Sequence, residues 1–139
     1  NENHYLVSIQ LPNYTKIQYD YDSQGNMIGF IKFFLQCIIE QCNNYIAKIN
    51  RIKQIYTKDM EKLKILNSNA VYRIMPAIMR QIVFTKKEIE EESGVSRNTV
   101  STLIDKLVEL DILVPDSNYA KLAYRYNEIY NVFIGKDMT

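Results

Sequence analysis

The stretch between residues 84 and 115, FTKKEIEEESGVSRNTVSTLIDKLVELDILVP, constrains the fold of this chain more than any other. Thr85 is suited to cap a helix in which Glu88, three residues on, reaches back to the cap, and Ser96 is suited to cap a second helix. Gly94 lies between the two helices, where its freedom to adopt a left-handed backbone lets the first helix end and the second begin. The stretch therefore predicts a helix-turn-helix followed by a short strand.

The apolar residues of this stretch fit two crossed helices, each with one buried face. They are Ile89 on the first helix, Val95 in the turn, and Val100, Leu103, Leu107 and Leu110 on the second helix. The outer face of the second helix then holds short polar and charged side chains, which are Arg97, Asn98, Ser101, Thr102, Asp105 and Lys106.

The residues that follow predict a small β-wing of two strands. Ile112–Val114 forms the first strand, residues 115–118 supply turn chemistry, and Leu122–Tyr126 returns antiparallel. Leu122, Tyr124 and Tyr126 alternate onto its covered face. A short closing helix is expected over Asn127–Ile134, with Ile129, Tyr130 and Phe133 pointing inward.

One long amphipathic helix is predicted from about Ile28. Its apolar stripe repeats at spacings of three and four and comprises Ile31, Phe34, Leu35, Ile38, Cys42, Tyr45, Ile46, Ile49, Ile52 and Tyr56. The two cysteines, Cys37 and Cys42, are five residues apart, which fits neither a zinc knuckle nor a disulfide within one helix, so we interpret both as core residues.

Two shorter helical segments join the long helix to the helix-turn-helix. The first runs from Met60 to Leu66. The second runs from about Ala70 to Arg80, with Ser68 or Asn69 as its cap. Pro76 lies inside the second segment and removes one backbone donor, so we expect a kink or a break there.

The N-terminal segment carries less information. Residues 1–21 lack sustained periodicity and are expected to be partly helical, whereas Asp22, Ser23, Gly25, Asn26 and Gly29 predict a loop. His4 is interpreted as a solvated side chain. The 139 residues contain no apolar run long enough to cross a membrane and no secretion signal at the N-terminus, which favours a cytoplasmic protein without a membrane partner.

The expected fold is therefore mainly α. A helical N-terminal part with one long amphipathic helix occupies residues 1–67, and a winged helix-turn-helix domain with a small two-stranded β-wing occupies residues 68–139.

This arrangement resembles the C-terminal region of bacterial Fic-family proteins. The likeness lies in the segment MIGFIKFFL at residues 27–35, the long helix after it, and the helix-turn-helix with Gly94-Val95-Ser96 and Asp111-Ile112-Leu113. It covers roughly residues 27–134. The resemblance implies that the chain lies at the end of a helical Fic core, and that the parent protein is an adenylyltransferase that uses ATP to modify protein hydroxyls.

The chain departs from the family at its catalytic loop. Fic enzymes use an H-x-F-x-x-G-N-G-R loop, in which a helix N-terminus holds nucleotide phosphates. Here His4 is followed by Tyr5 and Leu6, and Gly25-Asn26 continues to Met27. The resemblance therefore implies a fragment that follows the catalytic loop, with no catalytic residue, no metal ligand, no cofactor and no enzymatic activity of its own.

Sequence-specific binding to double-stranded DNA is the first functional hypothesis. The residues expected to contact DNA are Arg97, Asn98, Ser101 and Thr102 in the major groove, Lys106 near a phosphate, and Lys121 or Arg125 on the wing. The charge argues against strong binding, because residues 68–139 contain nine Lys or Arg and ten Asp or Glu, a net of −1. Glu90, Glu91 and Glu92 would also repel the DNA backbone.

A protein-interaction or autoregulatory module is the alternative hypothesis. The winged helix and the long helix would then dock on the parent Fic core or on a second copy in a homodimer, and neither partner requires a basic surface. The polar face of the second helix would in that case be an ordinary solvated face. An enzyme is a third hypothesis, but the chain contains no pair of carboxylates, no Cys-His arrangement and no phosphate loop that would support one.

Overall fold

The computed structural model describes residues 5–9, 17–21 and 27–136. The chain divides into two compact units between Ala47 and Lys48. This division falls inside the long helix α1 (Met27–Leu63), well before the predicted domain boundary after residue 67. The reason is that the last turns of α1 contribute Ile55 and Leu63 to the core of the second unit.

The N-terminal unit contains two strands where we expected partly helical structure. β1 (Tyr5–Ile9) and β2 (Ile17–Tyr21) pair antiparallel, with Tyr5 opposite Tyr21 and Ile9 opposite Ile17. The helical expectation is wrong for these residues, because β2 alternates Ile, Tyr and Tyr with Gln and Asp in the period of a strand. His4 and the predicted loop residues 22–26 lie outside the described residues, and Gly29 is helical.

Helix α1 confirms the predicted periodicity, and the first part of its apolar stripe is exposed. Phe33 and Cys37 are buried, whereas the predicted stripe is exposed from Ile31 to Ile49. Cys42, expected in the core, is exposed as well. The helix runs without interruption to Leu63 and continues as a 3₁₀ turn, η1 (Lys64–Leu66), so the separate segment from Met60 is not observed.

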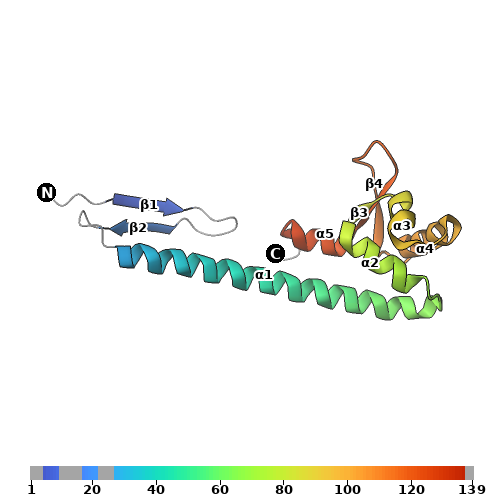
Figure 1. Cartoon of the computed structure of the whole chain (residues 1–139), viewed down its shortest axis with the longest axis horizontal. Helices are drawn as coiled ribbons and strands as arrows, with labels where there is room; N and C mark the ends of the chain where they lie inside the picture. Colours follow the sequence, from blue (N-terminus) through green and yellow to red (C-terminus); the bar gives the residue numbers. More distant parts are fainter. Residues whose placement is uncertain (1–4, 10–16, 22–26, 137–139) are drawn as a thin grey trace. The chain divides into compact units, whose positions relative to one another are not determined.

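The C-terminal unit combines helices with a small antiparallel sheet (Figure 1). Its elements in order are α2 (Val71–Gln81), β3 (Val83–Phe84), α3 (Lys86–Ser93), α4 (Arg97–Glu109), β4 (Leu113–Asp116), β5 (Ala123–Tyr126) and α5 (Asn127–Phe133). The sheet has three strands in the order β3-β5-β4, not the two that were predicted. The additional strand is β3, in which Phe84 pairs with Tyr124 of β5. It adds a third strand to the sheet just before α3 begins.

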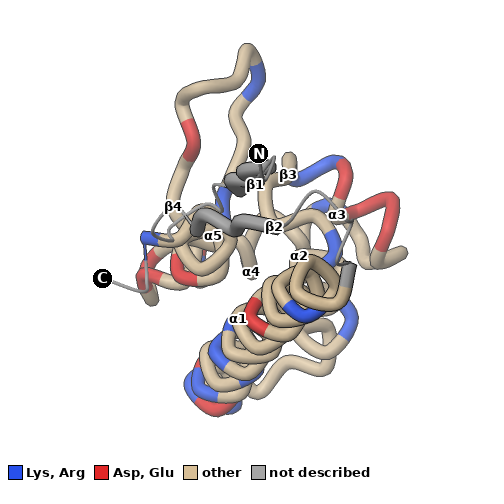
Figure 2. The backbone as a smooth tube through the Cα atoms, turned by 90° about the vertical axis from the view of Figure 1, so that its left-hand side faces the viewer, with Lys and Arg blue, Asp and Glu red and all other residues tan. Residues whose placement is uncertain are grey.

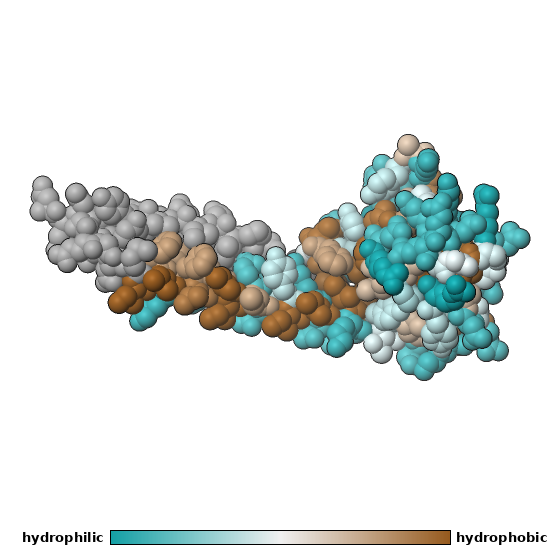
Figure 3. Space-filling model, in the orientation of Figure 1, coloured by the Kyte–Doolittle hydropathy of each residue, from teal (hydrophilic) through white to brown (hydrophobic). Residues whose placement is uncertain are grey.

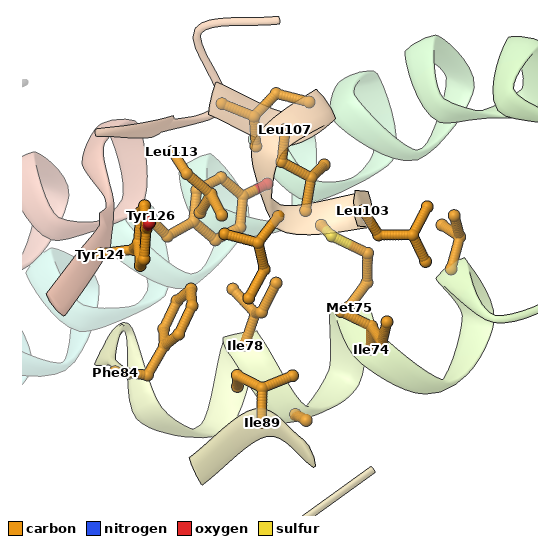
Figure 4. Close-up of a cluster of buried hydrophobic side chains, with 14 of the residues drawn as sticks. Ile74, Met75, Ile78, Phe84, Ile89, Leu103, Leu107, Leu113, Tyr124 and Tyr126 are labelled. Carbon is orange, nitrogen blue, oxygen red and sulfur yellow. The ribbon is translucent and has the colours of Figure 1, made fainter. Parts of the chain in front are cut away.

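A single hydrophobic core holds this unit together. Figure 4 shows the side chains of α2, α4 and the sheet pointing toward one another, with Ile89 of α3 beside Ile78. The core members that are at most 1% exposed include Ile74, Met75, Ile78, Phe84, Ile89, Ile104, Leu113 and Tyr126. Burial of side chains of this size stabilises by about 1.5–3 kcal/mol each before entropy is counted, so the core is the main source of stability.

Helix α2 departs from the predicted cap and from one of the two effects predicted for Pro76, the break. Its N-cap is Ala70, which makes no side-chain capping bond, so neither Ser68 nor Asn69 caps it. The helix also continues through Pro76, which excludes the predicted break. Met75 and Ala77 on either side of the proline are buried, and this packing outweighs the loss of one backbone hydrogen bond.

The segment from α3 to α4 has most of the predicted local geometry. The Thr85 hydroxyl accepts from the backbone N–H of Glu88, whose carboxylate accepts in return from the N–H of Thr85, which completes a capping box. Gly94 is left-handed with φ of 65°. Ser96 occupies the N-cap of α4 without a capping bond, since its hydroxyl pairs with that of Thr99 at 2.9 Å.

The end of α4 and the residues after it show further differences. Asp111 is left-handed with φ of 58°, and the N–H groups of Asp111 and Ile112 donate to the carbonyls of Val108 and Leu107, as in a Schellman motif.

Leu122 and Phe133 are exposed although both were predicted inward, and Ala123 and Val132 are buried in their place.

Replacement of Gly94 tests the turn. Gly94→Val should destabilise the C-terminal unit by more than about 1 kcal/mol, because a β-branched residue is strained at positive φ and its Cβ would lie 3.2 Å from Nη2 of Arg73. Thermal or urea unfolding measures the change. Gly29→Val in α1, where φ is not positive, is the control and should leave the unfolding of the C-terminal unit unaltered. Equal midpoints for both variants would show that the turn does not need glycine.

A buried hydrogen bond gives a second test of this unit. Tyr126 donates to Oδ2 of Asp59 at 2.7 Å. Burial and this bond raise the pKa of the Tyr126 phenol well above its ordinary value. The unfolded phenol ionises near its normal pKa of about 10, so this stabilisation is fully present below that pH and is lost as the pH rises above it.

Tyr126→Phe should therefore cost about 1–3 kcal/mol near neutral pH, because it leaves the Asp59 carboxylate buried without this donor. The variant should also lose less stability than the parent chain between pH 9 and pH 11. Denaturant unfolding across this range measures both effects. Tyr72→Phe, at an exposed tyrosine, is the matched control. Identical pH profiles for Tyr126→Phe and the parent chain would contradict the assignment.

Candidate nucleic-acid interface

Helix α4 presents a continuous polar face to solvent. Its inner face is fixed by four buried side chains, Val100, Leu103, Ile104 and Leu107. The predicted contact residues therefore lie on the outside, where Arg97, Asn98, Thr102 and Lys106 are exposed and Ser101 is half-buried. The structure brings these five predicted residues together on one helix surface.

The side chains of this face differ in how far they are already engaged. Thr102 donates its hydroxyl proton to the carbonyl of Asn98 at 2.9 Å, but its oxygen can still accept a hydrogen bond. Within the part of the chain that the structure describes, no hydrogen bond or ion pair involves the side chain of Arg97 or of Lys106. These two cations are therefore available to an external anion.

A lysine that the sequence did not single out lies beside this face. Nζ of Lys86, at the start of α3, donates to Oγ of Ser101 at 2.9 Å and to Oδ1 of Asp105 at 2.8 Å, and lies 5.6 Å from the ring centroid of Tyr124. Partial burial lowers the pKa of Lys86, but the bond to Asp105 and its neighbours' charges outweigh burial and raise it above its ordinary value. Lys86 is therefore cationic, and Asp105 is its counter-ion.

A shallow hollow follows the other side of α4. Asn98, Thr102 and Lys106 line it from the helix, and Ser68 lines it from the loop before α2, around a volume of about 270 Å³. The exposed amide, hydroxyl and ammonium groups supply both donors and acceptors. This set is suited to base edges and phosphate oxygens.

The hairpin between β4 and β5 adds a further basic residue. Lys121 is exposed and lines a hollow of about 260 Å³ together with Lys86 and Lys87 of α3. Figure 2 shows basic segments on this hairpin and at the start of α3. Three lysines from two elements therefore face one hollow, although only Lys121 was predicted from the sequence.

Arg125 does not fit the role that was predicted for it. Its Nη1 lies 3.5 Å from Oδ2 of the buried Asp116, its Nη2 donates to Asn127 at 3.1 Å, and its guanidinium stacks 4.6 Å from the centroid of the Tyr130 ring. The side chain is only 25% exposed. Arg125 thus links β5 to β4 and to α5, and it cannot reach a phosphate without breaking these contacts.

The acidic residues of α3 are partly neutralised. Glu92 accepts hydrogen bonds from Gln81 at 2.6 Å and Arg80 at 2.9 Å, and these bonds lower the pKa of Glu92. Glu91 lies 3.6 Å from the ammonium of Lys87. The repulsion expected from the glutamates of this helix is therefore weaker than their number suggests.

Other kinds of site were also sought. The described residues contain no cluster of three or more His, Cys, Asp or Glu side chains that could hold a metal ion. Among the helices that the structure describes, none has both the length and the apolar character needed to cross a bilayer. Protein-family models, curated proteins and solved structures yield no match to this chain.

Proposed function

We propose that the C-terminal unit is a winged helix-turn-helix module that binds double-stranded DNA, with α4 in the major groove and the β4–β5 hairpin as the wing. The observation that carries this proposal is the outer face of α4, where Arg97 and Lys106 are exposed beside the amide of Asn98 and the hydroxyl of Thr102. A recognition helix needs such short, unburied hydrogen-bonding groups in its first turns.

The ion pairs of the unit determine which of its charges remain unpaired. Asp105, Asp116 and Glu92 each lie within 3.5 Å of a cationic side chain of the same unit. Glu128 is paired in the same way with Lys58 of α1 at 2.7 Å. Arg97 and Lys106 on the outer face of α4 have no such partners among the described residues, so these two cations can contact phosphates even though the net charge of residues 68–139 is −1.

The chain as a whole is proposed to be the C-terminal regulatory part of a Fic-family protein. The support is the order of elements, in which a long helix that carries Phe33-Phe34-Leu35 near its start leads to the helix-turn-helix unit. The parent protein would transfer AMP from ATP to protein hydroxyls, whereas this chain would not. Labelled ATP with this chain alone should therefore give no labelled protein.

A protein-interaction module remains the second candidate. The observation that favours it is the exposed apolar surface of α1, which includes Ile28, Phe34 and Ile46. Such a surface binds protein rather than nucleic acid. In this case the parent Fic core or another protein would be the ligand, and the C-terminal unit would not retard DNA.

The loss of Arg97 tests base recognition. Arg97→Ala should weaken binding to a selected duplex by roughly 1–3 kcal/mol and relax the preference for that duplex, because Arg97 stands in the first turn of α4. Lys121→Ala should weaken all duplexes alike and reduce the salt dependence by about one ion. Fluorescence anisotropy at several salt concentrations measures both variants. An absence of DNA binding even at low salt would favour the interaction module.

Removal of the counter-ion of Lys86 should have the opposite effect. Asp105→Asn removes a negative charge from the face of α4 and releases the ammonium of Lys86, so DNA affinity should rise about threefold to tenfold, with roughly one more ion released. Glu128→Gln makes the same change in net charge on α5 and is the matched control. If both variants bind DNA equally well, Lys86 does not lie at the interface.

A further inference from the structure

The first half of α1 carries a large exposed apolar face. Figure 3 shows it as a run of hydrophobic side chains along the helix. Eight large side chains between residues 28 and 46 are each more than 40% exposed, and they are Ile28, Ile31, Phe34, Leu35, Ile38, Ile39, Tyr45 and Ile46. Phe33 and Cys37, on the other side of the helix, are buried. The exposed face therefore lies on the opposite side of the helix from these two buried side chains.

The spacing of this face is that of a coiled coil. Successive steps of three and four residues connect Ile28, Ile31, Leu35, Ile38, Cys42 and Tyr45 without a break. This is the alternation of a and d positions in a heptad repeat. Neither glycine nor proline interrupts α1 between Phe30 and Leu63, so the face can remain continuous against a second helix.

The area of the face is sufficient for a stable dimer. Half-exposed side chains of this size present on the order of 100 Å² each, so eight of them supply about 800 Å² per copy, which is what a partner buries in an interface of standard size. An uncovered apolar area this large is unusual on a monomer.

We propose that this face pairs with the same face of a second copy of the chain, as an antiparallel helix pair. The apolar pattern is self-complementary about a two-fold axis between residues 36 and 37. In that alignment Leu35 lies opposite Ile38 of the second copy, Ile31 opposite Cys42, and Ile28 opposite Tyr45. Each layer thus pairs an a position with a d position, as in an antiparallel coiled coil, and each contact occurs twice about the two-fold axis, as an isologous interface requires.

Charge disfavours the parallel alternative. In a parallel pair the g position of one helix faces the following e position of the other, which would oppose Lys48 to Lys53 of the second copy on both sides. The antiparallel alignment places Lys32 near Ile39, where its aliphatic stem can cover the apolar edge. No like charges oppose each other between residues 28 and 45 in this alignment.

Sedimentation of the full chain tests the association. The chain should sediment as a dimer at about 50 μM, and Leu35→Asn, at the centre of the proposed interface, should shift it to monomer by weakening association at least tenfold. Ile65→Asn, at a residue that is 75% exposed in η1, is the matched control and should remain dimeric. A parent chain that is monomeric at 50 μM would overturn the proposal. Circular dichroism should show that both variants keep their helices.

Cysteine crosslinking tests the direction of the pair. In a Cys37→Ser background, Ile31→Cys should form a covalent dimer with Cys42 of the second copy when oxidised glutathione takes up the two protons and two electrons of each thiol pair. The same background without Ile31→Cys should stay uncrosslinked, because the two Cys42 side chains lie far apart in the antiparallel alignment. Crosslinking through Cys42 alone would overturn the antiparallel arrangement, since a parallel pair places both in one layer. Neither result depends on DNA binding.

Discussion

The burial of Tyr126 against α1 is the contact on which the C-terminal unit depends. Tyr126 is fully buried, it ends the central strand of the sheet, and its hydroxyl reaches Asp59, which is 67 positions earlier in the chain. One side chain therefore joins the sheet to the last turns of α1. Because β5 also pairs with β3 and β4, this contact helps to fix the strand on which the hairpin and α5 depend.

The ion pairs of the unit have a common consequence for its surface. Buried or half-buried carboxylates accept hydrogen bonds from nearby side chains, as Asp116 does from Asn118 and Arg125. Ion pairs between exposed side chains add little stability. They do determine which cationic side chains remain unpaired. Arg97 and Lys106 of α4 have no ion-pair partner among the described residues, and the proposal of DNA binding rests on these two cations rather than on net charge.

Local signals predicted the fold best where several of them agreed. Thr85, Glu88 and Gly94 specify a cap, a helix start and a left-handed turn within ten residues, and the structure confirms all three. Contacts between residues far apart in the chain could not be read in this way. Nothing local indicates that Val83 pairs with Arg125, or that Lys86 approaches Asp105, because both contacts arise only after the sheet and helices have packed.

Burial was harder to predict than periodicity. The stripe of α1 has the correct spacing, but whether Ile38 or Cys42 is covered depends on what packs against that face, which the helix itself does not specify. For β2, the alternation from Ile17 to Tyr21 is a strand signal, but it spans only five residues. The candidate site was predicted in part, since α4 presents Arg97 and Asn98 as expected while Arg125 is engaged elsewhere.

The central claim is that the outer face of α4 binds DNA. Backbone amide chemical shifts of the isotopically labelled chain, recorded with increasing amounts of a mixed-sequence duplex at low salt, test it most directly. Our account expects the largest shifts at Arg97–Lys106 and around Lys121, with reversal on addition of salt. Shifts confined to α1, or no shifts at an excess of duplex, would contradict it.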